Sequence, residues 1–151
     1  MRYTTEVSIN LPRSKVIEFF DNTENLYKWQ PGLKNFEHIS GQPGQEGASS
    51  KLVYEGRKGD LVMTETITKR KFPEEFNGVY EARGVYNEIY NYFEKVGDNE
   101  TIWRTESVFR FRGLMALMAP FMKSAFTNNT LLNMERFKIF AESLEASQEQ
   151  K

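Results

Sequence analysis

The sequence GLMALMAPFMKSAFTNNTLLNMERFKIFAESLEA, residues 113–146, is the longest amphipathic segment of the chain. Its apolar side chains recur at helical spacing, which predicts one long helix with a single buried stripe. Pro120 lies near the beginning of this segment and predicts a separate turn or a kink there. The stripe is expected to contain Met115, Ala119, Met122, Phe126, Thr130, Asn133, Phe137, Phe140 and Leu144.

The stretch between Lys34 and Arg112 is predicted to consist almost entirely of strands separated by short turns. Residues 3–9 alternate apolar and polar side chains, which predicts an earlier strand, and two short helices are expected before Pro31. Because one long helix can cover its apolar stripe only against the sheet, the two must enclose a core or a cavity. This order predicts one α+β domain over residues 1–151 with an antiparallel sheet. The later strands are expected at Phe36–Ser40, Lys51–Tyr54, Leu61–Arg70, Phe76–Ala82, Val85–Val96 and Thr101–Arg112.

The composition excludes several classes of function. The chain has 20 basic and 21 acidic residues, and its net charge of −1 gives no electrostatic case for binding nucleic acid or an anionic membrane surface. It contains no cysteine, so thiolate chemistry and disulfides are excluded. With one histidine, His38, no metal site or cofactor is predicted. No apolar run reaches the roughly 20 residues of a membrane span, so we expect a cytoplasmic protein without stable membrane insertion.

The strand pattern also predicts which side chains face inward. Arg104, Glu106 and Arg110 share one face of the last strand and must face water, so Trp103 and Phe109 point inward. Pairing this strand with its neighbours through short turns extends the inner face across the sheet. For strand 61–70, the register that buries the most apolar area places Met63, Glu65 and Ile67 inward. The inner face of the preceding strands is then expected to include Tyr80, Asn87, Ile89, Asn91 and Phe93.

Two features of this inner surface leave alternatives open. Glu65 either pairs with a nearby Arg, Tyr or Asn as a structural group, or has a raised pKa and acts as an acid or base. Thr130 and Asn133 interrupt the apolar stripe of the helix. They either bond to backbone or water, or cross a cavity and contact a ligand there.

The same register sends Tyr86, Tyr90 and Tyr92 to the outer face. Aromatic residues are common on strands, so these tyrosines need no special function. Alternatively they form a patch for a partner protein or for self-association. A monomer or a weak homodimer is expected.

Several short motifs resemble those of a known superfamily. The most specific stretch is Ile9-x-x-Pro12, Val16, Phe20-Asp21, Asn25 and Trp29-x-Pro31, and weaker matches are Gly41, Gly44, Gly47, Phe72-Pro73, Thr101 and Gly113. Over nearly its full length the chain resembles the START-like, or Bet v 1-like, helix-grip superfamily (SRPBCC), and most of all its bacterial polyketide cyclase/dehydrase and lipid-transport branch. The resemblance implies an apolar cavity between a curved sheet of about seven antiparallel strands and the long C-terminal helix. It implies activities from lipid carriage to polyketide cyclisation.

We therefore predict that the chain binds a small hydrophobic or amphipathic, lipid- or polyketide-like ligand between sheet and helix. It lacks a histidine, arginine or acid pair like those of the better-known catalytic members. The alternative is a cyclase or dehydratase in which Glu65 or Tyr80 is the acid or base. The predicted ligand-binding residues are Ile89, Phe93, Trp103, Phe109, Met122, Phe126 and Phe137 as the apolar walls, and Glu65, Tyr80, Asn87, Asn91, Thr130 and Asn133 as polar groups.

Overall fold

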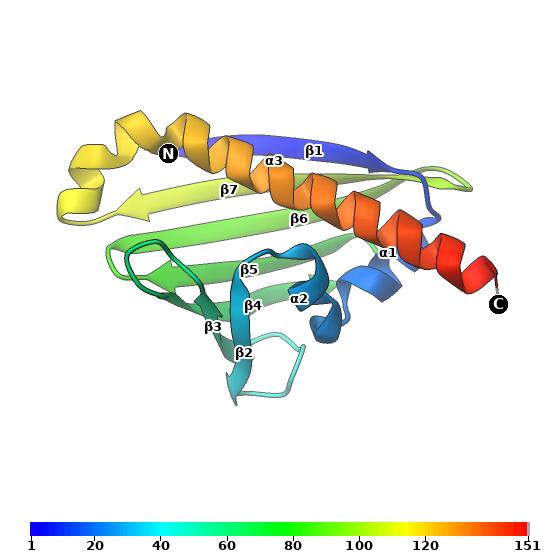
Figure 1. Ribbon diagram of the computed structural model, residues 1–151, viewed down its shortest axis with the longest axis horizontal. Coiled ribbons are helices and arrows are strands. Elements are labelled where there is room, and N and C mark those ends of the chain that lie inside the picture. Colours follow the sequence, from blue (N-terminus) through cyan, green and yellow to red (C-terminus); the bar gives the residue numbers. More distant parts are fainter. Residues whose placement is uncertain (151) are drawn as a thin grey trace.

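Seven antiparallel strands form one curved sheet, and a single long helix crosses its inner face (Figure 1). The computed structural model describes residues 1–150. The strands lie in the order β1-β7-β6-β5-β4-β3-β2, which confirms the predicted α+β helix-grip fold. The elements are β1 (Arg2–Ile9), α1 (Arg13–Phe20), the 3-10 turn η1 (Thr23–Asn25), α2 (Leu26–Trp29), β2 (Leu33–Ser40), β3 (Ser49–Tyr54), β4 (Leu61–Lys71), β5 (Glu75–Ala82), β6 (Val85–Gly97), β7 (Glu100–Phe111) and α3 (Leu114–Glu149).

The strand register agrees with the one predicted from the alternation of side chains. Phe93 pairs with Trp103 across β6 and β7, and Tyr80 of β5 pairs with both Asn87 and Glu65. The register of β4, which was chosen because it buries the most apolar area, is therefore also confirmed. β2 begins at Leu33, earlier than predicted, because a bulge after this buried residue lets the strand continue.

The long helix α3 is continuous but bent. Figure 1 shows its first turns, in yellow, running in a different direction from the rest, and Pro120 lies within this part. A proline removes one backbone hydrogen bond inside a helix, and this loss accounts for the bend. Of the two predicted alternatives, the structure therefore shows the kink and not a separate turn. The turn from β7 into α3 is made at Gly113, whose φ of 61° and ψ of −137° strongly favour glycine.

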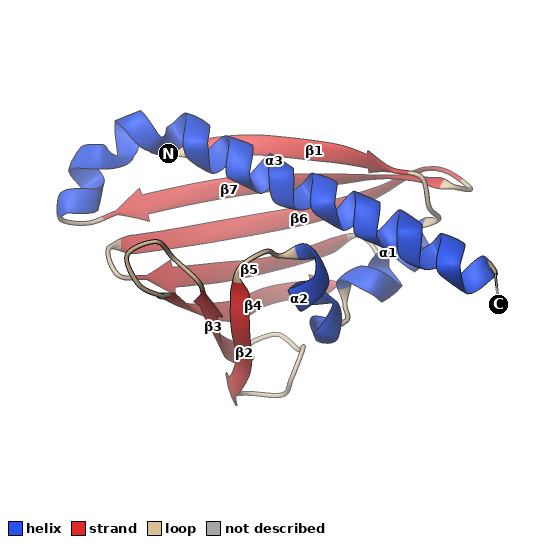
Figure 2. Ribbon diagram, viewed as in Figure 1, coloured by secondary structure: helices blue, strands red, loops and turns tan. Residues whose placement is uncertain are grey.

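One end of the space between sheet and helix is closed by aromatic side chains. Phe137 of α3 is fully buried, with its ring centroid 5.1 Å from that of Trp29 and 5.3 Å from that of Trp103. Phe20 of α1 packs edge-on against Phe93, at 5.0 Å. As Figure 2 shows, the two short helices α1 and α2 lie at this end of the sheet. Their apolar faces complete the core there.

The buried stripe of α3 differs in part from the predicted one. Met134 and Ala141 are buried, although neither belonged to the predicted stripe, whereas Asn133 is only half-buried. α3 lies mainly over β1 at the edge of the sheet, where Thr5 Oγ1 donates to Met134 Sδ at 3.2 Å. The bend and this off-centre position rotate the contact face away from the one expected for a straight helix.

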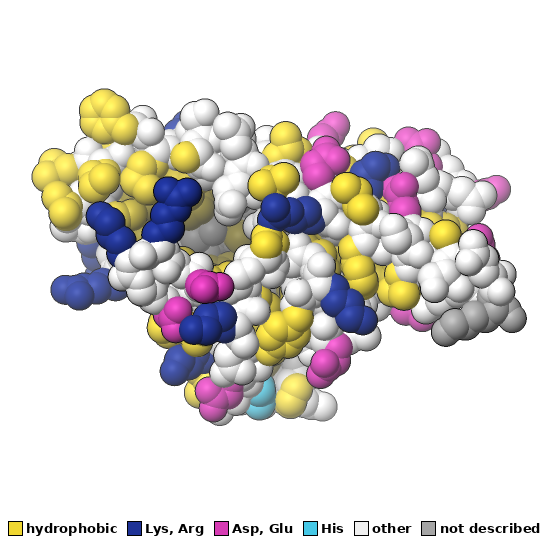
Figure 3. Space-filling view, viewed as in Figure 1, with side chains coloured by type: hydrophobic (Ala, Val, Ile, Leu, Met, Phe, Trp, Pro, Cys, Tyr) yellow, Lys and Arg dark blue, Asp and Glu magenta, His cyan; other side chains and the backbone are white. Residues whose placement is uncertain are grey.

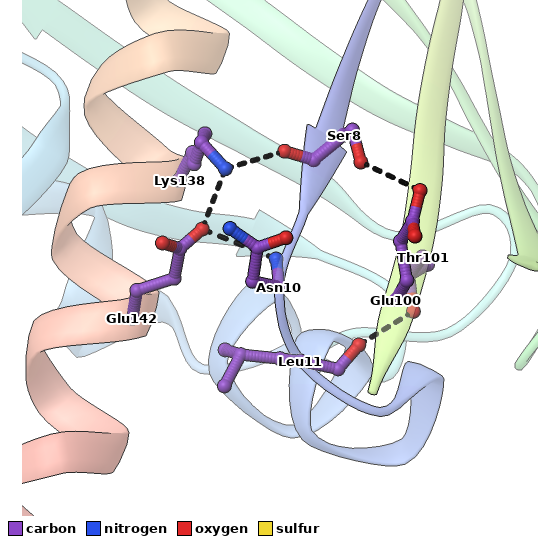
Figure 4. Close-up of polar contacts among 7 residues, drawn as sticks. All are labelled: Ser8, Asn10, Leu11, Glu100, Thr101, Lys138 and Glu142. Atoms are coloured by element: carbon purple, nitrogen blue, oxygen red, sulfur yellow. Dashed lines mark hydrogen bonds and ion pairs between the residues drawn. The ribbon is translucent and has the colours of Figure 1, made fainter. Parts of the chain in front are cut away.

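Polar contacts fix the second half of α3 to the end of β1, which is itself bonded to the start of β7 (Figure 4). The Lys138 ammonium donates to the carbonyl of Ser8 at 2.6 Å and contacts Glu142 at 2.7 Å. The backbone N–H of Asn10 donates to the same Glu142 carboxylate. The helix is therefore anchored at one end. Across residues 1–150, no helix is both long enough and apolar enough to traverse a bilayer.

Candidate ligand-binding site

A row of polar side chains crosses the inner face of the sheet, away from the aromatic end. Directly paired residues on successive strands build it: Ser50 on β3, Glu65 on β4, Tyr80 on β5 and Asn87 on β6. The next partner in the register is the apolar Phe109 of β7. We call the four polar residues the inner polar row. Figure 3 shows this face of the molecule hollowed between the first half of α3 and the β3–β4 hairpin.

The centre of the inner polar row is a hydrogen-bonded pair of acids. The Tyr80 hydroxyl donates to Glu65 Oε2 at 2.6 Å. Burial raises the pKa of the Glu65 carboxyl above its ordinary value, and the bond from Tyr80 offsets only part of this effect. Burial and the neighbouring Glu65 also raise the pKa of Tyr80. The environment therefore favours the neutral form of both groups.

Three buried polar atoms of the inner face and the aromatic end lack a hydrogen-bond partner among residues 1–150. Asn87 Oδ1 and Ser107 Oγ lie at the inner polar row, whereas Trp29 Nε1 lies in the aromatic end. Ser107 is 1% exposed and pairs with Ile89, two residues from Asn87 on β6. A buried polar atom without a partner costs free energy, so such atoms mark places where a further molecule can bond. They offer an acceptor, a hydroxyl and a donor.

The side-chain oxygen of Asn91, a residue predicted to bind a ligand, already accepts hydrogen bonds from protein groups. Its Oδ1 accepts from Trp103 Nε1 and from Thr105 Oγ1, both at 2.9 Å, and its backbone N–H donates to Asn77 Oδ1. Asn87 lies four residues away on the same strand and the same face, yet its Oδ1 is free. The structure thus separates two asparagines that the sequence grouped together.

The other predicted residues fall into two groups. Phe93, Trp103 and Phe137 lie in the closed aromatic core, whereas Ile89 lies beside the inner polar row. Phe109 stacks on Phe126 of α3 at 5.1 Å, near the open part of the inner face.

The polar gap in the stripe of α3 is partly filled from β1. Thr130 Oγ1 lies 2.7 Å from the hydroxyl of Tyr3, so these two groups satisfy each other. Asn133 and Met122 are half-buried on α3. The structure therefore favours a structural role for Thr130.

Sequence reasoning missed several residues that belong to this region. Tyr54 of β3 shares the inner face with Ser50 and donates to Gln30 Oε1 at the end of α2. Burial raises the pKa of Tyr54. Ser107 shares the strand parity of the inward Trp103 and Phe109, but a lone serine gives no chemical signal that would select it as a site residue. Trp29 was named only as part of the Trp29-x-Pro31 motif, and its place in the aromatic end depends on the position of α2.

Two of the three outward tyrosines lie against basic side chains of β7. The Arg104 guanidinium lies 5.1 Å from the ring centroid of Tyr92, and that of Arg110 lies 5.6 Å from Tyr86. Tyr90 donates to Glu88 at 2.6 Å. These contacts agree with the predicted outward direction of the three tyrosines, which are half-buried by their neighbours.

Two surface hollows lie away from the inner polar row. One, of about 240 Å³, is lined by Pro12, Pro73, Lys95 and Asp98, and the other, of about 380 Å³, by Asn10, Lys15, Glu142 and neighbouring residues. Charged side chains border both, so they suit an apolar molecule poorly. We therefore place the candidate site on the inner face.

The raised pKa of Glu65 has a consequence for stability. An acid whose pKa is higher in the folded state destabilises the fold once pH rises above its unfolded value of about 4.3. We expect Glu65→Gln to stabilise the protein at neutral pH by about 1 kcal/mol, since Gln can still accept from Tyr80. The gain should vanish at a pH below the unfolded pKa, where both forms are neutral.

Thermal melts of the two proteins across that pH range measure this effect. Glu81→Gln is the matched control, because Glu81 follows Tyr80 on β5 but is exposed. A melting temperature of Glu65→Gln that equals that of the wild type at neutral pH would show that burial of this carboxylate is not costly.

Comparison of the sequence finds no matching family model and no match among curated proteins. Solved structures do match. A START superfamily protein from Mycobacterium smegmatis is 11% identical with a TM-score of 0.78, covering 95% of this chain and 98% of that one. The Zhui aromatase/cyclase from Streptomyces sp. R1128 is 11% identical with a TM-score of 0.78, covering 94% and 93%. Norcoclaurine synthase from Thalictrum flavum, solved with dopamine and hydroxybenzaldehyde, is 10% identical with a TM-score of 0.70, covering 95% and 87%.

Proposed function

We propose that this chain, which has a START-like helix-grip fold, binds a small, neutral, largely apolar molecule on the inner face of its sheet. The observation that carries the proposal is the presence of two buried atoms without protein partners, Asn87 Oδ1 and Ser107 Oγ, on the same inner face as the Glu65–Tyr80 pair. Asn87 Oδ1 would accept from a ligand hydroxyl or amine, and Ser107 Oγ would donate or accept. Phe109, Phe126 and Ile89 would contact its apolar part.

The charges around the inner polar row select against anionic ligands. The inner polar row contains one carboxyl group, that of Glu65, and no basic side chain. Its inner-face neighbours add no charge; they are Tyr54, Met63, Ile67, Ile89 and Ser107. An anionic group bound there would be desolvated without a cation to compensate it. Glu65 could ionise beside an amine, so a cationic ligand is compatible with the site. A free fatty acid with its carboxylate at this row is not.

A matched pair of fluorescent probes tests this proposal. N-phenylnaphthylamine is neutral, and anilinonaphthalene sulfonate has the same rings with an added sulfonate. We expect the neutral probe to bind with increased fluorescence and the sulfonate to bind at least about tenfold more weakly, because its charge would be desolvated.

Ile89→Trp, which places a bulky ring beside the row, should weaken binding of the neutral probe. A control is Tyr90→Trp, which places the same side chain on the outer face of β6. Equal affinity for the two probes, or equal binding by wild type and Ile89→Trp, would place the probe elsewhere and refute the proposed site.

A second candidate function is proton transfer to a bound substrate. The neutral Glu65 carboxyl favoured by burial could donate a proton to a substrate carbonyl, and Tyr80 could orient the carboxyl. The aromatase/cyclase among the similar structures makes a polyketone-like compound the first substrate to assay. Glu65→Gln should then abolish turnover and leave binding of the neutral probe intact. Turnover that survives this substitution would eliminate Glu65 as the acid.

A further inference from the structure

The first half of α3 exposes an apolar surface to solvent. Leu114, Leu117, Met118 and Phe121 follow helical spacing and lie on one side of the helix. Phe121 is 88% exposed and Leu117 is 73% exposed. We call these four residues the α3 apolar patch. The adjoining side of these turns, with Met115 and Met122, is also apolar, and residues 114–122 contain no polar side chain.

The second half of the same helix is built differently. It is anchored to β1 through Lys138 and Glu142, and its exposed side carries charged residues such as Glu135 and Arg136. The bend that includes Pro120 separates the two halves (Figure 1). The most exposed apolar side chains of α3 are thus concentrated in its first half, which the contacts of Lys138 and Glu142 do not hold.

The charges beside the α3 apolar patch are basic. No acidic residue occurs from Ser107 to Met134, whereas Arg112 and Lys123 lie on either side of the patch in the chain. Arg83 lies in the β5–β6 turn, which contacts the start of α3. In this turn Gly84 lies beside Met115, and the Gly84 carbonyl accepts a hydrogen bond from the backbone N–H of Arg112. Within residues 1–150, none of these three cations forms an ion pair. Figure 3 shows dark-blue basic side chains beside the yellow group at this end of the molecule.

We propose that the α3 apolar patch docks on the surface of an anionic lipid bilayer. The four apolar side chains would enter the boundary between headgroups and acyl chains, and the flanking cations would contact lipid phosphates. A second copy of the chain is a poorer partner, because a symmetric contact through this patch would bring the basic flanks of both copies together. This docking is independent of what the inner face binds, and the bilayer is contacted without being crossed.

Vesicle co-sedimentation tests the proposal on the free protein. The wild type should sediment with vesicles of phosphatidylcholine mixed with phosphatidylserine and much less with phosphatidylcholine alone. Phe121→Asp should reduce partitioning at least about tenfold, because a charge replaces the most exposed ring. Arg112→Glu or Lys123→Glu should each reduce it about fivefold or more, and added salt should do the same.

Ile139→Asp is the matched control, because Ile139 is 64% exposed on the anchored half of α3 and should tolerate the charge without losing vesicle binding. Circular dichroism confirms that each variant is folded. The proposal is overturned if the wild type stays in the supernatant with mixed vesicles, or if Phe121→Asp sediments like the wild type. A wild-type dimer that Phe121→Asp converts to a monomer, with no vesicle binding, would also overturn it and assign the patch to self-association.

Discussion

Replacing Asn91 with leucine is expected to destabilise the protein by about 2–4 kcal/mol. The substitution removes the acceptor of both Trp103 Nε1 and Thr105 Oγ1, and it leaves these two donors buried without partners. Asn87→Leu should change stability by less than about 1 kcal/mol, because Asn87 Oδ1 has no partner to lose. Urea unfolding of the two variants and the wild type measures the difference.

Ligand affinity should respond to the two substitutions in the opposite order. Asn87→Leu should alter the affinity for ligands that carry a hydroxyl or an amine, since it removes the free acceptor. Asn91→Leu, measured at a temperature where it remains folded, should retain binding of the neutral probe. Equal destabilisation by the two substitutions would contradict the division of the inner face into a saturated core and an unsatisfied site.

Phe137→Ala is expected to have the largest effect on the fold, about 3–5 kcal/mol of lost stability. Its side chain is fully buried and lies against Trp29, Trp103 and Phe20, so truncation would leave a cavity among rigid rings. Since the ring joins α3 to the sheet and to α2, the helix would also lose its main apolar anchor.

Ile139→Ala, two residues away on the exposed side of α3, provides the comparison and should cost less than about 1 kcal/mol. Chemical denaturation followed by tryptophan fluorescence suits this test, because both tryptophans lie beside Phe137. If Phe137→Ala unfolds at the same denaturant concentration as Ile139→Ala, the aromatic end is not the core described above.

The sheet was predictable because its alternation leaves few choices. Arg104 and Glu106 force Trp103 inward, and a short turn then pairs Trp103 with Phe93. A one-residue slip would turn an entire strand over, so the direction of Glu65 and Tyr80 followed from their neighbours. Local rules therefore gave the fold and the inner face.

The sequence could not predict that the side-chain oxygen of Asn91 has hydrogen-bond donors beside it whereas that of Asn87 has none. This difference depends on which protein donors lie within hydrogen-bond distance, and Trp103 Nε1 contacts Asn91 only because of the curvature and pairing of β6 and β7. Met134 was missed for a similar reason, since the contact face of α3 depends on its bend and on its position over β1. These are tertiary properties that a helical wheel does not contain.

Net charge was also a poor guide to the surface. The overall value of −1 gave no case for an anionic membrane. The fold nevertheless concentrates charge, because the β5–β6 turn that carries Arg83 is hydrogen-bonded through Gly84 to the backbone of Arg112, just before α3. An average over the chain conceals this local excess, which depends on how strands and helix meet.

Amide NMR during a titration with N-phenylnaphthylamine tests the central claim most directly. We predict that the side-chain amide of Asn87 and the backbone signals of Glu65, Tyr80 and Ser107 shift with the added probe, and that the side-chain amide of Asn91 shifts far less. Shifts confined to residues 114–121 of α3, with no change at Glu65, Tyr80 or Asn87, would contradict a ligand site on the inner face.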